Sequence, residues 1–210
     1  MGKIIAVANQ KGGVGKTTTN VNLGACLARL GKRILTVDID PQGNTTSGLG
    51  VEKETLNNSV YEVMINNVPI REAIVSTMVD GLDLLPSNIN LVGAEIEMTS
   101  MIAREHILKG CLDQIRSDYD FILIDCPPSL GLLTLNALTA ADKVLVPIQC
   151  EFFALEGLSD LMNTVRIVRR SLNPRLFLEG VLLTMFDGRT NLAMQVAEEV
   201  KHYFPGKVYA

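Results

Sequence analysis

A glycine-rich loop near the N-terminus constrains the fold of this chain more than any other feature. The apolar run Lys3–Ala8 is predicted to be a buried strand, and Lys16–Leu30 is predicted to be a helix. Between them stands Asn9-Gln10-Lys11-Gly12-Gly13-Val14-Gly15. A buried strand that enters a helix through so short a loop begins a β-α unit, which needs further strands beside it.

The rest of the chain repeats this alternation of short apolar runs and longer helical segments. Runs such as Phe121–Ile124 are continuously apolar, which is typical of strands covered on both faces. The sequence therefore predicts an α/β fold, a mostly parallel twisted sheet with helices on both faces in three α/β/α layers. The other predicted strands are Arg33–Val37, Leu82–Leu85, Lys143–Pro147 and Phe177–Thr184, and the other predicted helices are Met101–Arg116, Leu132–Ala140, Leu155–Leu172 and Leu192–Tyr203. The polar stretch Glu52–Asn67 is expected to be a surface excursion.

Length and composition favour one folded domain. The 210 residues are 47% hydrophobic and 20% charged, which supports a core and excludes a disordered chain. No repeat or linker divides residues 1–210, so a single domain is predicted. No segment reaches the roughly 20 apolar residues of a membrane span. Four cysteines without a C-x-x-C pair indicate reduced thiols and a cytoplasmic location.

Charge is distributed unevenly along the chain. The net charge of -4 argues against a nucleic-acid partner when the chain is taken as a whole, because a phosphate backbone attracts lysine and arginine. From Arg166 onward, however, seven basic and four acidic residues give +3, and the remainder carries -7. The average therefore conceals a basic final stretch.

The glycine-rich loop has the composition of a phosphate-binding loop, as in P-loop NTPases. Glycines let backbone amides wrap phosphate oxygens, and the following helix points the positive end of its dipole at the same anion. Lys16 is predicted to contact the β- and γ-phosphates of ATP, and the Thr17 hydroxyl to bind Mg²⁺. The predicted nucleotide-binding residues are Lys11, Gly12, Gly13, Val14, Gly15, Lys16, Thr17 and Thr18.

Acidic residues follow two other predicted strands. Asp38 and Asp40 follow the second strand, where alternation places both side chains on one face. A carboxylate just past a strand end can hold a water in line with a γ-phosphate. Asp125 follows the run Phe121–Ile124 and is predicted to bind Mg²⁺, most often through water. Because ligands of such sheets bind at the carboxyl ends of the strands, one site is predicted.

The loop resembles a particular family. Lys-Gly-Gly-Val-Gly-Lys-Thr-Thr, residues 11–18, is similar to the deviant P-loop of the ParA/MinD ATPases, with Gln10 where the usual P-loop has glycine. The resemblance implies that Lys11 reaches across an ATP-dependent homodimer to the other subunit's phosphates, as an arginine finger does. It also implies that Asp40 positions the attacking water and that Asp38 supports it near the metal.

Longer stretches resemble the chromosome-partitioning ParA (Soj-type) branch. They are Asp38–Gly50, Asp125–Gly131 and Gln149–Leu158. The resemblance implies an ATP-bound dimer that binds double-stranded DNA without sequence preference. A ParB-type centromere-binding protein is then expected to stimulate slow hydrolysis and release the dimer. The resemblance therefore implies a cytoplasmic, nucleoid-associated protein with no membrane partner.

The segment Thr184–Asn191 also resembles the family. The resemblance places Met185 near the adenine and makes Arg189 a candidate contact to the DNA backbone. It further implies that the chain lacks the C-terminal strand, base-binding loop and helix typical of the family. Part of the adenine pocket and of the DNA surface would belong to that segment.

Two alternatives share the same loop. A MinD-type, membrane-associated cell-division ATPase would end in a basic amphipathic helix that binds lipid. A metabolic enzyme on this fold would be a ligase with its own substrate pocket, or a reductase component with two cysteines per chain at a bridging cluster. Only Cys126 lies by a site loop, and the motifs favour partitioning.

Overall fold

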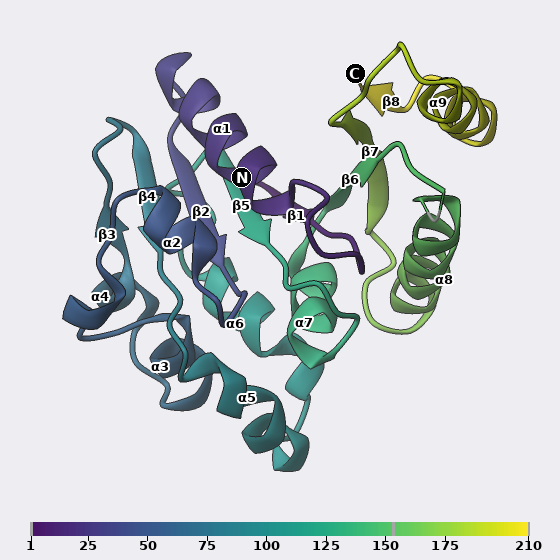
Figure 1. The fold of residues 1–210 in the computed structure, drawn as a ribbon. Helices are drawn as coiled ribbons and strands as arrows, with labels where there is room; N and C mark the ends of the chain where they lie inside the picture. The colour runs from purple at the N-terminus through teal and green to yellow at the C-terminus, as the bar shows by residue number, and fades with distance from the viewer. Residues whose placement is uncertain (1, 153, 210) are drawn as a thin grey trace.

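The computed structural model describes residues 2–152 and 154–209. Within these residues the strands form one eight-stranded sheet of order β3-β4-β2-β5-β1-β6-β7-β8 (Figure 1). All neighbouring strands are parallel except β3 and β4, which are antiparallel. The strands are β1 (Lys3–Val7), β2 (Ile34–Asp38), β3 (Val75–Ser76), β4 (Leu82–Leu85), β5 (Phe121–Asp125), β6 (Lys143–Gln149), β7 (Phe177–Thr184) and β8 (Val208–Tyr209). The predicted parallel α/β sheet is confirmed.

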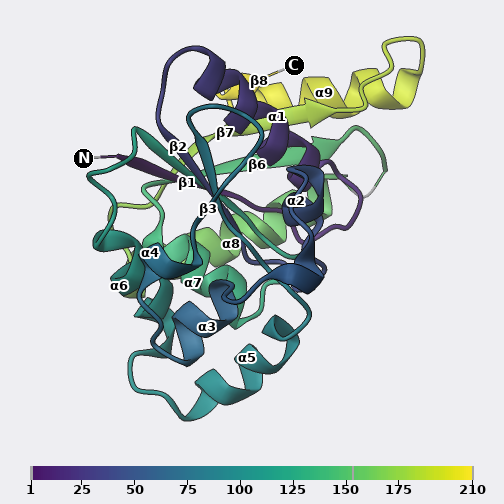
Figure 2. The ribbon, with the colours of Figure 1, turned by 90° about the vertical axis from the view of Figure 1, so that its left-hand side faces the viewer.

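Helices cover both faces of the sheet. Alternation along β1 sends Ile4 and Ala6 into one buried cluster and Ile5 and Val7 into another, so the strand is buried on both sides. Figure 2 shows α3, α5, α6 and α7 on the side of the sheet opposite α1. The helices are α1 (Lys16–Arg29), α2 (Asn44–Gly48), α3 (Val60–Ile65), α4 (Ile70–Ala73), α5 (Leu91–Glu97), α6 (Ile107–Asp113), α7 (Leu132–Ala140), α8 (Ala154–Ser171) and α9 (Asn191–Tyr203).

The predicted helix Met101–Arg116 is wrong in its extent. The structure has a short 3₁₀ turn, Arg104–His106, followed by α6. Ala103 has φ 53°, in the left-handed region that interrupts a right-handed helix. The amide of Leu108 donates a hydrogen bond to Asn136 Oδ1 (3.1 Å), so α7 fixes the start of α6.

The stretch Glu52–Asn67 is not the simple surface excursion that was predicted. Helix α3 lies within it, and Val60, Val63 and Met64 are buried in the core. Ser59 and Glu62 form a capping box, in which each side chain satisfies an orphan backbone amide at the helix start. A helix of less than two turns shows too few apolar repeats to be predicted when polar residues surround it.

The parallel strands place the predicted site residues together. The carboxyl ends of β1, β2, β5, β6 and β7 face the same edge of the sheet, because these strands are parallel. The predicted site residues lie at or just after the ends of β1, β2, β5 and β7. This edge is where ligands of open α/β sheets bind.

Candidate functional site

The loop between β1 and α1 forms an open anion cradle. Gly13 and Gly15 have φ angles of 75° and 86°, which residues with a side chain adopt only at a cost. Gly15 caps α1 without a side-chain hydrogen bond, and no acidic residue lies in the first turn. The free amides and the positive helix end are therefore available to an anion.

Lys16 points back into this cradle. Its Nζ donates a hydrogen bond to the carbonyl oxygen of Lys11 (2.9 Å), so the loop folds around the ammonium. Burial lowers the pKa of Lys16, while the nearby Asp125, Cys126 and Asp40 raise it in opposition. A buried ammonium whose hydrogen bond goes to a neutral carbonyl is well placed to bind a phosphate oxygen instead.

A carboxylate with two hydroxyl partners lies beside the loop. The hydroxyls of Thr17 and Thr45 donate to Asp125 Oδ2 at 2.8 and 2.7 Å. Burial raises the pKa of Asp125 to about 6, the two threonine bonds and Lys16 lower it, and Asp40 raises it. Asp125 Oδ1 is buried without a hydrogen-bond partner. A hydroxyl and an unpaired carboxylate oxygen are the hard oxygen ligands that Mg²⁺ takes, so this cluster fits the metal.

Asp38 lies next to Asp125, its register partner on the neighbouring strand. Its Oδ2 accepts hydrogen bonds from the amide and hydroxyl of Thr46, both 2.8 Å, and its Oδ1 accepts from the Asp40 amide (3.2 Å). Burial, followed by the charge of Asp125, raises the pKa of Asp38 to about 7, against these hydrogen bonds. Both oxygens are occupied, which suits a supporting position behind the metal ligands.

Asp40 sits at the tip of a tight turn after β2. Its Oδ1 accepts from the Gln42 amide (3.0 Å), and its carbonyl accepts from the Gly43 amide (2.9 Å). Gly43 has φ 61°, and a Cβ there would stand 2.7 Å from Lys53 Cδ and 3.0 Å from the Ser87 carbonyl oxygen. Glycine is thus required to close a turn that holds the Asp40 carboxylate near Lys16 and Asp125.

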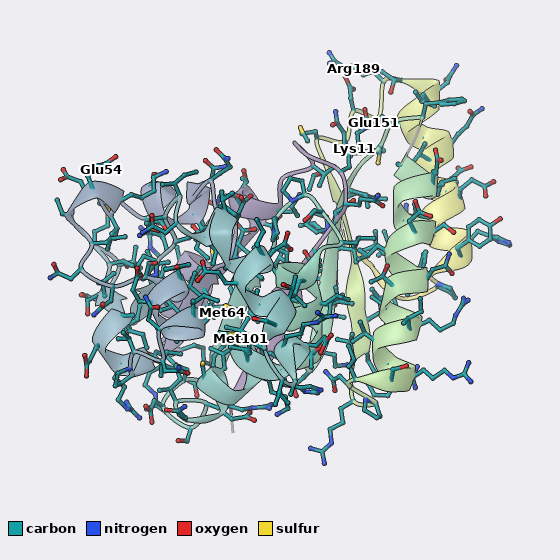
Figure 3. All side chains as sticks on the ribbon, turned by 90° about the horizontal axis from the view of Figure 1, so that it is seen from below. Lys11, Glu54, Met64, Met101, Glu151 and Arg189 are labelled. Carbon is teal, nitrogen blue, oxygen red and sulfur yellow. The ribbon has the colours of Figure 1, made fainter. Side chains whose placement is uncertain are left out.

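Lys11 stands apart from the buried carboxylates. Its ammonium forms an ion pair with Glu151, from the loop between β6 and α8, and both side chains are about one-third exposed (38% and 33%). Figure 3 labels Lys11, Glu151 and Arg189 along one edge of the molecule. Lys11 therefore lies at the rim of the site, whereas Lys16 lies inside it.

The remaining predicted residues occupy the loop after β7. Met185 is 59% exposed and has φ 50°, a strained conformation for a residue with a side chain. Arg189 is exposed and donates to both carboxylate oxygens of Asp187. Thr184 joins this loop to the cradle, because its hydroxyl lies 2.9 Å from the carbonyl oxygens of both Val14 and Ile148.

Other predicted loop residues are on the cradle surface or beneath it. Gly12, Gly13 and Thr18 are exposed, and Val14 is buried. The side chains that the structure adds are Asn9, Thr45, Thr46, Glu151 and Thr184. Asn9 opens the glycine-rich loop, and the other four lie in stretches that resemble the family, but nothing in the sequence indicated which groups their side chains would contact. Within the described residues, no group of three His, Cys, Asp or Glu side chains could hold a metal alone.

Fold and site together define a P-loop nucleoside triphosphatase. A family model described as an AAA domain matches residues 2–178. The chain is 61% identical over 209 residues to the sporulation initiation inhibitor protein Soj of Bacillus subtilis, covering 100% of this chain and 83% of the relative. It is 52% identical to the chromosome partitioning protein ParA of Myxococcus xanthus, covering 100% and 74%.

A solved structure agrees with this assignment of the fold. A Mycobacterium smegmatis protein crystallised with ADP and magnesium, described as cobyrinic acid a,c-diamide synthase, superposes with a TM-score of 0.92 and 45% identity, covering 98% of this chain and 83% of that one. The chain belongs to the ParA/MinD family of P-loop ATPases, and within it to the Soj/ParA chromosome-partitioning group. Across residues 2–152 and 154–209, no helix is long and apolar enough to cross a membrane.

Proposed function

We propose that this protein is a DNA-partitioning ATPase that binds ATP with Mg²⁺, dimerises, and then binds double-stranded DNA without sequence preference. A ParB-type partner stimulates its slow hydrolysis and so releases the DNA. The observation that carries the proposal is that Lys16, Thr17, Asp125 and Asp40 lie together at the edge of the sheet where the carboxyl ends of the parallel strands meet. Those are the groups that triphosphate hydrolysis needs.

In this proposal the cradle binds and orients the nucleotide. The backbone amides of the loop and the α1 N-terminus hold the phosphates, and the Lys16 ammonium moves from the Lys11 carbonyl to the β- and γ-phosphate oxygens. Thr17 and Asp125 Oδ1 would hold Mg²⁺, which supplies neutralising positive charge when bound. Met185, exposed in the loop after β7, is proposed to lie near the adenine.

Asp40 is proposed to orient the attacking water. Its Oδ1 is turned toward the Gln42 amide, and the remaining oxygen is free to accept a hydrogen bond from water. Asp38 fixes the turn from beneath, since its Oδ1 accepts the Asp40 amide proton. Loss of Asp40 would therefore stop hydrolysis while leaving the phosphate contacts in place.

Dimerisation is proposed to bring Lys11 to the other subunit's phosphates. Lys11 is at the rim and about one-third exposed, where a second subunit can meet it. Two facing lysine-bearing loops repel one another unless bound phosphates lie between them. Dimerisation would for that reason depend on ATP.

Arg189 is proposed to contact the DNA backbone. It is exposed, and the chain from Arg166 onward carries +3, which a dimer would double. Such a dimer would associate with the nucleoid in the cytoplasm. No lipid-binding element is part of the proposal.

DNA co-sedimentation tests this function. We expect binding with ATP and Mg²⁺, little binding with ADP or without nucleotide, and a steep loss of affinity with salt. A parallel assay uses anionic phospholipid vesicles. ATP-dependent binding to the vesicles without binding to DNA would overturn the proposal in favour of a MinD-type ATPase.

The name of the Mycobacterium structure raises a ligase as a second candidate. A ligase needs an additional substrate pocket beside the phosphates. A direct assay for ATP-dependent amidation of cobyrinic acid, with a nitrogen donor supplied, separates the two functions. We expect no amide product, and amidation at the rate of ATP consumption would replace our proposal.

A further inference from the structure

The proposed trans-acting lysine is held by its own subunit at both ends. At the backbone end, the Lys11 amide donates to Asn9 Oδ1 (3.0 Å), and Asn9 Nδ2 donates to the Pro147 carbonyl oxygen (2.7 Å). At the side-chain end, the ammonium pairs with Glu151 (Figure 3). Pro147 lies in β6, and Glu151 lies in the loop directly after it. The end of β6 therefore fixes both the backbone position of Lys11 and the direction of its side chain.

The two anchors differ in burial. Asn9 is 4% exposed, and its bonds lie beneath the loop. The Lys11 and Glu151 side chains are each about one-third exposed, so water screens part of their attraction, while the Glu151 Oε1 that meets the ammonium is itself covered. The backbone anchor can persist while the ammonium swings away. A triphosphate carries more negative charge than one carboxylate and can displace Glu151 from the ammonium.

We propose that Glu151 is a positioning residue, which keeps the Lys11 ammonium on its own subunit until phosphates on a second copy of the chain replace the carboxylate. The inference rests on the proposed ATP-dependent dimer. It adds a threshold, by which we mean the free energy needed to open the Lys11–Glu151 ion pair before the dimer can form. Without phosphates, Lys11 is occupied and its charge is neutralised locally. With phosphates on the opposite subunit, the lysine changes partners and the dimer closes.

The size of the threshold follows from the exposure of the pair. Exposed ion pairs couple by about two- to fivefold in equilibrium constant. Because two such pairs must open for each symmetric dimer, the product is about four- to twenty-five-fold in the dimer dissociation constant. An effect of this size shifts the monomer–dimer equilibrium but does not prevent dimerisation when ATP is bound.

The test removes the charge of Glu151 and compares it with a nearby control. Both Glu151→Gln and Glu156→Gln are made in an Asp40→Ala background, so that hydrolysis does not dissolve the dimer. Glu156 is exposed in the first turn of α8. Light scattering over a protein dilution series with ATP and Mg²⁺ gives the dimer dissociation constant. We expect Glu151→Gln to tighten the dimer about four- to twenty-five-fold, and Glu156→Gln to change it less than twofold.

A second readout follows Lys11 without any dimer. The rate at which an acylating reagent modifies Lys11 in the nucleotide-free monomer is measured by mass spectrometry. Glu151→Gln is expected to raise that rate about two- to fivefold, and Glu151→Asp to restore it partly. Unchanged acylation would show that the ion pair does not hold Lys11, and would overturn the proposal whatever the dimer does.

The outcomes separate this inference from the proposed function. If the parent protein does not dimerise with ATP, the proposed function fails, and the threshold fails with it. If the parent dimerises and Glu151→Gln dimerises equally or more weakly, only the role of Glu151 fails. Thermal melting of each variant, expected within about 2 °C of the parent, shows that all remain folded.

Discussion

The two halves of the candidate site, at the carboxyl ends of the strands, are built in opposite ways. On the β2 and β5 side, Asp38 and Asp125 are buried, and Thr17, Thr45 and Thr46 donate hydroxyls to them. On the other side, Lys11 after β1 and Arg189 after β7 reach the surface and pair with the nearby carboxylates of Glu151 and Asp187. The first half is a buried network of hydrogen bonds, and the second is a set of surface ion pairs that can exchange partners.

This difference matches the two tasks that the proposal assigns to the edge. A metal and an attacking water need fixed oxygens, which burial and multiple hydrogen bonds provide. A second subunit and DNA arrive and leave, so their contacts must first be available at the surface and exchangeable. The contrast predicts that substitutions on the buried side disturb folding and chemistry, whereas those on the exposed side change association.

Lys16→Ala is expected to have the largest effect. Removing the buried ammonium leaves the phosphates without their main charged partner, at a loss of about 3–5 kcal/mol. Binding of a fluorescent ATP analogue should weaken by at least about 100-fold on that basis. Lys32→Ala, on the exposed turn after α1, is the matched control and should bind normally. Retained affinity in Lys16→Ala would place the triphosphate elsewhere.

Lys11→Ala should separate binding from assembly. The monomer should bind ATP within about twofold of the parent, because Lys11 lies at the rim. The ATP-dependent dimer should weaken by about tenfold or more, and hydrolysis should fall with it, as when an arginine finger is removed. Analytical ultracentrifugation with ATP measures the first effect and phosphate release the second. An equally strong dimer would remove the trans role.

Thr46→Val tests the buried half. The Thr46 hydroxyl donates to Asp38 Oδ2 and accepts from the Ser87 amide (2.9 Å), and the residue is fully buried. Valine keeps the shape but leaves the buried Ser87 amide without its partner and removes one of the two hydrogen bonds to Asp38 Oδ2, so the free energy of unfolding should fall by about 1–3 kcal/mol. Thr55→Val, at an exposed site, should cost less than about 0.5 kcal/mol in the same denaturant titration. Equal losses would contradict a specific network.

Arg189→Glu should give the smallest effect, limited to DNA. Affinity for DNA should fall about three- to tenfold at low salt. The negative slope of log affinity against log salt should become shallower by about one for each DNA phosphate that the variant no longer neutralises. Arg175→Glu, just before β7 at the opposite edge of the sheet, is the control with the same charge change. If both variants bind DNA equally weakly, general charge explains the effect and a specific role for Arg189 is not needed.

Much of this arrangement could be predicted from the sequence, because it depends on strand order and strand ends. Continuous apolar runs identify β1, β5 and β6, and parallel strands bring Lys16, Asp40 and Asp125 to one edge. The short helix α3 was missed because a capping box and three buried residues are a weak periodic signal.

The partners of the site residues could not be predicted. Thr45 and Thr46 are ordinary residues in a polar segment, and only the turn closed by Gly43 directs their hydroxyls to different carboxylates. Glu151 is 140 positions from Lys11 in the sequence and meets it because β6 pairs with β1. Such pairs depend on three-dimensional register, for which no local pattern exists.

The most direct test of the central claim is the molar mass of Asp40→Ala in solution with ATP and Mg²⁺. We expect this variant to bind ATP, to hydrolyse it at least about 100-fold more slowly than the parent, and to accumulate at twice the monomer mass, whereas ADP should leave it monomeric. A variant that binds ATP yet keeps the monomer mass would contradict ATP-dependent dimerisation. A variant that hydrolyses ATP at the parental rate would contradict the assignment of Asp40.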